Sequence, residues 1–71
     1  MEKTILNLMV NGQPYPYTGN PLPSAVLTDY GAKPERVALV LNDQVLPREQ
    51  WAATTLSDGD RLEIIVMAGG G

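Results

Sequence analysis

The dipeptide Asn11-Gly12 constrains the fold more than any other feature of this sequence. The tight turn that joins two antiparallel strands needs positive φ at both central residues, which asparagine and glycine tolerate best. The run 4–10 before it carries apolar residues at every second position from 6 to 10, as a strand with one buried face does. Residues 13–18 are therefore predicted to return as a second strand. The two prolines in that segment place it at a sheet edge, because proline cannot donate to a ladder.

A short, one-sided helix is predicted to follow the hairpin. Pro23, Val26, Leu27 and Tyr30 are spaced i, i+3, i+4 and i+7, which puts all four on one helix face. Prolines at positions 21 and 23 are compatible only with the first helical turn. Gly31 stands where a left-handed residue commonly ends a helix. The helix is expected to cover about residues 22–30.

The second half of the chain is predicted to contain three more strands. Residues 37–41 are almost continuously apolar, as a central strand would be. Residues 61–67 alternate, with 62, 64 and 66 on one face and the odd positions on the other. The remaining segments are a tight turn at 42–43, a short return at 44–46, a helical turn from Pro47 through Trp51 and a turn at 57–60.

This order of elements predicts an α+β fold of the β-grasp, or ubiquitin-like, arrangement. Its mixed sheet would have four to five strands, with one helix packed on one face. A right-handed crossover through the helix would place the last strand beside the first, in the middle of the sheet. Residues 1–66 are expected to form the domain, and residues 67–71 a flexible, glycine-rich C-terminal tail.

Composition excludes several classes of function. Without cysteine or histidine, the chain offers no thiol or serine–histidine nucleophile and no zinc finger, so no cofactor or metal is expected. A net charge of −3 without a basic stripe argues against a nucleic-acid partner. No apolar run approaches the roughly 20 residues that span a bilayer, and the N-terminus lacks signal-peptide features. A cytoplasmic location is therefore expected.

The run Pro47-Arg48-Glu49-Gln50-Trp51, then Asp58-Gly59-Asp60, an apolar strand and a terminal Ala-Gly-Gly resembles the ThiS family of sulfur carrier proteins of thiamine biosynthesis. The resemblance covers essentially the whole chain. Members of that family usually end in two glycines, whereas this chain ends in three. The reacting carboxylate is accordingly expected on Gly71, or on Gly70 if the last residue is trimmed.

The residues themselves favour chemistry at the C-terminus. No side chains form a nucleophile–base pair, so the terminal carboxylate is the most plausible reactive group. Ala68, Gly69 and Gly70 suit the threading of that terminus into a narrow channel, because glycine adopts backbone angles closed to other residues. From Met67 to Gly71 the extended chain spans at most about 17 Å. No phosphate-binding glycine motif is present, so the ATP machinery must belong to a partner.

The resemblance implies a reaction sequence and three partners. A ThiF-like adenylyltransferase, related to ubiquitin-activating enzymes, would activate the terminal glycine with ATP. Sulfur derived from a persulfide, through a cysteine desulfurase, would replace AMP and leave a thiocarboxylate. Thiazole synthase, ThiG, would then take that sulfur into the thiazole ring of thiamine. The protein would be a protein-bound co-substrate of these enzymes and not a catalyst.

Ile65 and Met67 are predicted to lie opposite the core face, next to the tail. They are either scattered exposed apolar residues, which are common, or a docking patch for the activating enzyme and the synthase. Two other functions stay open. One is a sulfur carrier of molybdopterin synthase, although this chain lacks the proline-rich stretch that those carriers often have before their diglycine. The other is a β-grasp interaction module without carboxylate chemistry.

Overall fold

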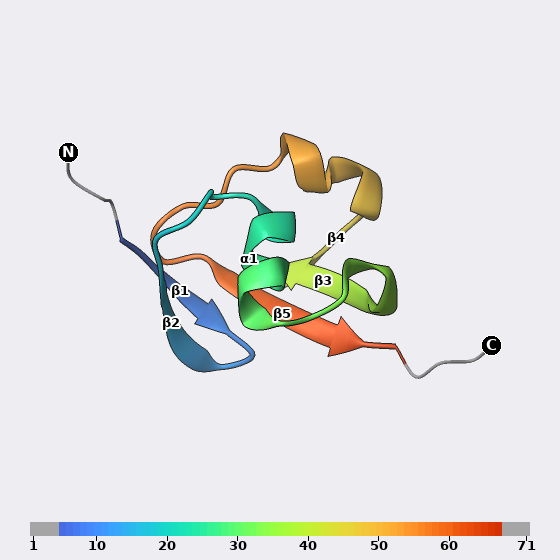
Figure 1. Cartoon of the computed structure of the whole chain (residues 1–71), viewed down its shortest axis with the longest axis horizontal. Coiled ribbons are helices and arrows are strands. Elements are labelled where there is room, and N and C mark those ends of the chain that lie inside the picture. The colour runs from blue at the N-terminus through green and yellow to red at the C-terminus, as the bar shows by residue number, and fades with distance from the viewer. Residues whose placement is uncertain (1–4, 68–71) are drawn as a thin grey trace.

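A computed structural model of the chain describes residues 5–67. Its strands and helix follow the predicted order (Figure 1). Two short 3₁₀ helices, η1 and η2, flank the hairpin of β3 and β4. In chain order the elements are β1 (Leu6–Val10), β2 (Gln13–Tyr17), α1 (Pro23–Tyr30), η1 (Pro34–Arg36), β3 (Val37–Leu41), β4 (Gln44–Leu46), η2 (Arg48–Ala53) and β5 (Arg61–Val66).

The five strands form one mixed sheet in the order β2-β1-β5-β3-β4. β1 and β5 run parallel, and the other neighbouring strands are antiparallel. The α1 helix lies across one face of this sheet (Figure 1). The β-grasp prediction is therefore confirmed, including the position of the last strand beside the first. Right-handed crossovers of this kind return the chain to the centre of the sheet.

Both predicted tight turns have the backbone that their residues favour. Asn11 and Gly12 have φ of 52° and 80°, and Asn42 and Asp43 have φ of 50° and 70°. Gly31, with φ of 93°, ends α1, and its N–H donates to the carbonyl of Leu27 at 3.0 Å. The left-handed residues of the two turns set where β1 and β3 reverse, and therefore how far each strand extends along β5.

The core lies between α1 and one face of the sheet. Its members are apolar residues of β1, α1, β3 and β5 together with two aromatic side chains and one loop leucine: Leu8, Val10, Tyr17, Val26, Leu27, Val37, Leu39, Trp51, Leu56, Leu62 and Ile64. Within residues 5–67 no helix is long and apolar enough to cross a membrane.

Three details of the predicted pattern are wrong. Tyr30 has the spacing of a buried residue but is 43% exposed, because it ends α1 and its ring packs at the rim against Tyr15. Val66 shares the core parity of β5 but is 71% exposed, since β1 pairs with β5 only as far as Leu62. Pro47 precedes η2 as its N-cap residue instead of opening it.

The Pro-Arg-Glu-Gln-Trp run has a structural role in η2. Trp51 is 6% exposed, and its Nε1–H donates to the carbonyl of Leu46 at 3.0 Å. The Arg48 guanidinium lies 4.7 Å from the centre of the Trp51 ring, a cation–π distance. Trp51 therefore belongs to the core cluster.

Candidate functional site

The candidate site lies at the end of β5 where the chain leaves the sheet. The backbone N–H of Met67 donates to the carbonyl of Arg36 at 2.8 Å, which continues the β3–β5 ladder one residue past the strand. The predicted threading residues Ala68, Gly69 and Gly70, and the predicted reactive Gly71, lie outside the described residues. The structure therefore describes the surface from which the predicted tail departs.

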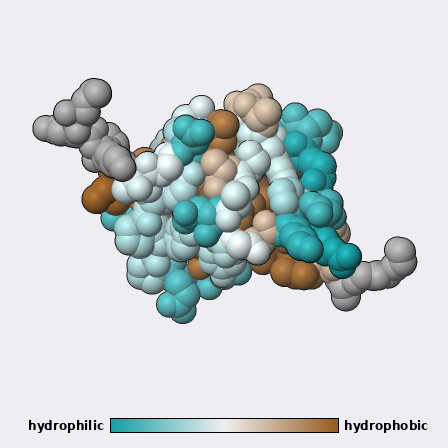
Figure 2. All heavy atoms as spheres, viewed as in Figure 1, coloured by the Kyte–Doolittle hydropathy of each residue, from teal (hydrophilic) through white to brown (hydrophobic). Residues whose placement is uncertain are grey.

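Ile65 and Met67 are each 48% exposed. They lie on the face of the sheet opposite α1, because Leu62 and Ile64, at the alternate positions, are buried in the core. Hydrophobic atoms also reach the surface beside the point where the undescribed C-terminal residues begin (Figure 2). Exposed apolar area at a strand end is compatible with docking; the docking role of these two residues stays a prediction.

The structure joins Ile65 and Met67 to three apolar residues that sequence reasoning missed. Ala38 of β3 lies directly opposite Ile65, and Val40 lies opposite Val45 of β4. Val45 is 74% exposed, and Ala38 and Val40 are half-buried. We call this set the outer patch: Ala38, Val40, Val45, Ile65 and Met67. Cross-strand neighbours of this kind form one continuous surface. The sequence alone could not group these residues, because it does not give the register between β3, β4 and β5.

A shallow groove of ≈ 220 Å³ continues from the outer patch toward η2. It is lined by Met67, Val45 and Ala38 on one side and by Pro47, Arg48 and Trp51 on the other. The Arg48 side chain also donates to the carbonyl of Val37 at 3.5 Å, so it covers the part of the β3 edge that β4 is too short to reach. The groove therefore places one cation beside an apolar surface.

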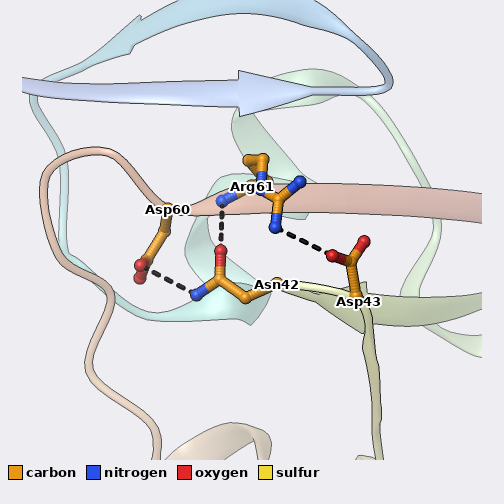
Figure 3. A network of polar contacts seen from close by, with 4 residues as sticks. All are labelled: Asn42, Asp43, Asp60 and Arg61. Carbon is orange, nitrogen blue, oxygen red and sulfur yellow. Dashed lines mark hydrogen bonds and ion pairs between the residues drawn. The ribbon is translucent and has the colours of Figure 1, made fainter.

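The opposite end of β5 is held by a polar network (Figure 3). Asn42 Oδ1 accepts the Arg61 backbone N–H at 2.9 Å, and Asn42 Nδ2 donates to Asp60 at 3.1 Å. The Arg61 guanidinium pairs with Asp43 at 2.9 Å. The Asp58 carboxylate accepts the backbone N–H of Asn7 at 2.7 Å. The side chains of the turns at 42–43 and 57–60 thus hold neighbouring strands together. Within residues 5–67 no three acidic side chains gather closely enough to bind a metal ion.

The tyrosines of β2 fasten the hairpin to α1. Tyr15 and Tyr17 stack with ring centres 6.5 Å apart, and the Tyr15 hydroxyl donates to the Asp29 carboxylate. Burial, and then the hydrogen bond to Asp29, raise the pKa of Tyr15 to about 12. Its hydroxyl therefore remains protonated near neutral pH. This cluster connects β2 to α1 and lies away from the outer patch.

The described residues contain no enclosed polar site. Among residues 5–67, the aromatic Tyr17 and Trp51 are the buried side chains with a hydrogen-bonding group, and no charged side chain is buried. Catalytic groups are usually desolvated in a cleft, where their pKa values shift.

Comparison with known proteins supplies the family context. A model described as the ThiS family matches residues 8–71. The crystal structure of a thiamine biosynthesis protein (ThiS) from Geobacter metallireducens superposes with a TM-score of 0.77 at 39% identity, covering 93% of this chain and all of that one.

Two sequence relatives add detail. The sulfur carrier protein ThiS of Escherichia coli strain K12 is 44% identical over 34 residues, which are 48% of this chain and 52% of that protein. A thiazole synthase of Paramagnetospirillum magneticum is 30% identical over 66 residues, 93% of this chain. The chain spans 20% of that synthase's length, so one segment of the longer protein resembles nearly the whole of this one.

Proposed function

The chain belongs to the ThiS family, and from this premise we propose that it is a sulfur carrier in thiamine biosynthesis. The observation that carries this proposal is the extent of the family match, which runs from β1 through the terminal glycines, residues 8–71. The matching β-grasp fold of the Geobacter protein supports it. A non-reactive β-grasp module would not require a match that continues through the glycines.

In the proposed reaction the terminal carboxylate, on Gly71 or on Gly70 after trimming, attacks the α-phosphate of ATP and pyrophosphate leaves. A ThiF-like adenylyltransferase performs this step. A persulfide-derived sulfur, supplied through a cysteine desulfurase, then attacks the acyl carbon and AMP leaves. A thiol then attacks the donor's sulfur in the resulting acyl disulfide, so that the S–S bond breaks, donor and thiol are joined as a disulfide, and the chain is left with a glycyl thiocarboxylate. Activation is needed because a carboxylate delocalises its charge and has a poor leaving group.

The chain's own contribution is to present its terminus. Met67 still hydrogen-bonds to Arg36 next to β3, and four residues, 68–71, follow it in the sequence. Fully extended, they span at most about 14 Å. We propose that Ile65 and Met67, within the outer patch, contact the activating enzyme and then the synthase, while Ala68, Gly69 and Gly70 thread into the partner's active site. In this role the protein is a co-substrate and not a catalyst.

The resemblance to a segment of a thiazole synthase supports ThiG as the final partner. In the Paramagnetospirillum protein, a segment similar to this chain is covalently joined to the rest of the synthase. Joining two modules raises their effective concentration when they act on each other. The proposed acceptor of the sulfur is therefore the thiazole ring under construction on that enzyme.

Intact mass spectrometry tests the proposal. The full chain is incubated with ATP, a ThiF-like adenylyltransferase, a cysteine desulfurase, cysteine and a thiol reductant. We expect one oxygen to be replaced by sulfur at the C-terminus. A chain lacking Gly71 is the matched control for the position of the reacting carboxylate, and a chain lacking both Gly70 and Gly71 should gain no sulfur. Thiamine-independent growth supported by the doubly truncated chain would refute the carrier role.

A further inference from the structure

The backbone of β5 is open on one side of its second half. β5 bonds to β3 through its odd-numbered residues: the Arg61 carbonyl accepts from the Asn42 N–H at 2.8 Å, and the Met67 N–H donates to the Arg36 carbonyl at 2.8 Å. In such a ladder alternate residues point their N–H and C=O groups to opposite sides. The corresponding groups of Leu62, Ile64 and Val66 therefore face the side of β1.

β1 covers only the first of these three residues. The parallel pairing ends at Leu62, whose carbonyl accepts from the Asn11 N–H at 2.9 Å. The Asn11 side chain then takes the place of a further strand residue, because its Oδ1 accepts the Ile64 N–H at 2.7 Å. Beyond that point the Ile64 carbonyl and the Val66 N–H and carbonyl have no partner among residues 5–67. In Figure 1 the end of β5 extends past the hairpin.

The chain protects the outer side of β2 and the part of β3 that β4 does not reach. The outer strand β2 carries Pro14 and Pro16, which cannot donate to an added strand. Where β4 ends, Arg48 reaches the Val37 carbonyl. The open stretch Ile64–Val66 differs from these ends, and its Val66 side chain is 71% exposed. An unprotected strand edge is a template for pairing with another chain.

We propose that this edge of β5 accepts an extended strand of the activating enzyme, and that the resulting hydrogen bonds at Val66 aim the tail into that enzyme's active site. The inference rests on the proposed function and adds a second contact to the outer patch. The position of this edge identifies the activating enzyme as its occupant. The edge ends two residues before Ala68, and only about 14 Å of extended chain remains beyond Met67. A strand paired here therefore belongs to the protein that receives the tail. Apolar contacts are non-directional, whereas strand addition fixes direction through main-chain hydrogen bonds.

Amide hydrogen exchange of the full chain tests this geometry. In the free protein the Val66 amide should exchange faster than the ladder amides of Ile65 and Met67, which serve as internal controls. Saturating ThiF-like adenylyltransferase, without ATP, should slow exchange at Val66 by tenfold or more. Unchanged exchange at Val66 in the saturated complex would overturn the proposal. Protection of Val66 that rises with carrier concentration alone would also overturn it, by assigning the edge to a second copy.

A proline substitution gives an independent readout. V66P removes the Val66 N–H without touching the β3 ladder, and V66T keeps the N–H while changing the side chain. V66P should raise the KM for the carrier in adenylation about tenfold, and V66T should raise it less; equal effects would overturn the proposal. If V66P does not fold, a synthetic chain with an ester in place of the Val66 amide replaces it. Sulfur gained by the wild-type chain, measured by mass, separates failure of this inference from failure of the carrier role.

Discussion

The two ends of β5 differ although they belong to one six-residue strand. At its beginning, Leu62 has strands on both sides and is 1% exposed. At its end, Val66 has a strand on one side only and is 71% exposed. One strand is therefore held by two neighbours where it begins and by one neighbour where it ends, and the reversal of β1 at Asn11 separates the two parts.

The largest expected effect is on stability at the beginning of β5. Leu62→Ala should lower the free energy of unfolding by about 2–5 kcal/mol, because it leaves a cavity in the core. A chain of this length has only about 4–11 kcal/mol in total. Ile65→Ala is the matched control at the other end and should cost about 1 kcal/mol, since the side chain is half exposed. Urea unfolding measures both, and equal losses would contradict the division of the strand.

The polar network at the same end should contribute less. Asn42→Ala loses the bonds to Arg61 and Asp60 and places alanine at positive φ, so we expect a loss of about 2 kcal/mol. Asn42→Gly relieves the backbone and should cost about 1 kcal/mol through the lost bonds alone. Thermal or urea unfolding measures the pair. A glycine variant as unstable as the alanine variant would show that backbone strain has no part in the effect.

At the exit end the expected effect is on recognition and not on folding. Met67→Asp should raise the KM for the carrier in adenylation about tenfold, because a charge enters an apolar contact. Met67→Leu keeps the apolar area and should lose less. Adenylation rates at limiting carrier, with circular dichroism as the folding check, decide the matter. Unchanged rates for Met67→Asp would remove Met67 from the docking surface.

The smallest effect is expected for the ion pair of Arg61 and Asp43, whose side chains are 58% and 77% exposed. Asp43→Asn removes the charge and keeps a residue type that tolerates positive φ, so it should change the free energy of unfolding by less than about 1 kcal/mol. The change should shrink further at high ionic strength, since salt screens exposed charges. A salt-independent loss would contradict an effect through the ion pair.

Local patterns were sufficient for much of this molecule. The hairpin turns at Asn11 and Asn42, the helix end at Gly31 and the alternation along 61–65 are local signals, and the structure confirms each of them. Together they predicted the β-grasp order of strands. The exposure of Ile65 and Met67 also followed from alternation along a single strand, which requires no knowledge of its neighbours.

The outer patch could be predicted only in part. Alternation places Ala38 and Val40 on one face of a strand, but their position beside Ile65 depends on the register between β3 and β5. The exposure of Val66 could not be predicted from the sequence either. Alternation along β5 places Val66 on the same face as the buried Leu62 and Ile64, but β1 ends before it and Val66 is exposed.

Short stretches of sequence were enough to establish which residues alternate, where the chain turns and that it ends in glycines. How far each strand runs beside its neighbour emerged only in the folded chain, and this overlap sets which apolar side chains join in the outer patch and which backbone groups of β5 stay open. The physical reason is that turns and alternation depend on the conformation of a few consecutive residues. Register and strand overlap instead depend on contacts between segments distant in the chain, such as the hydrogen bond from the Ile64 N–H to Asn11.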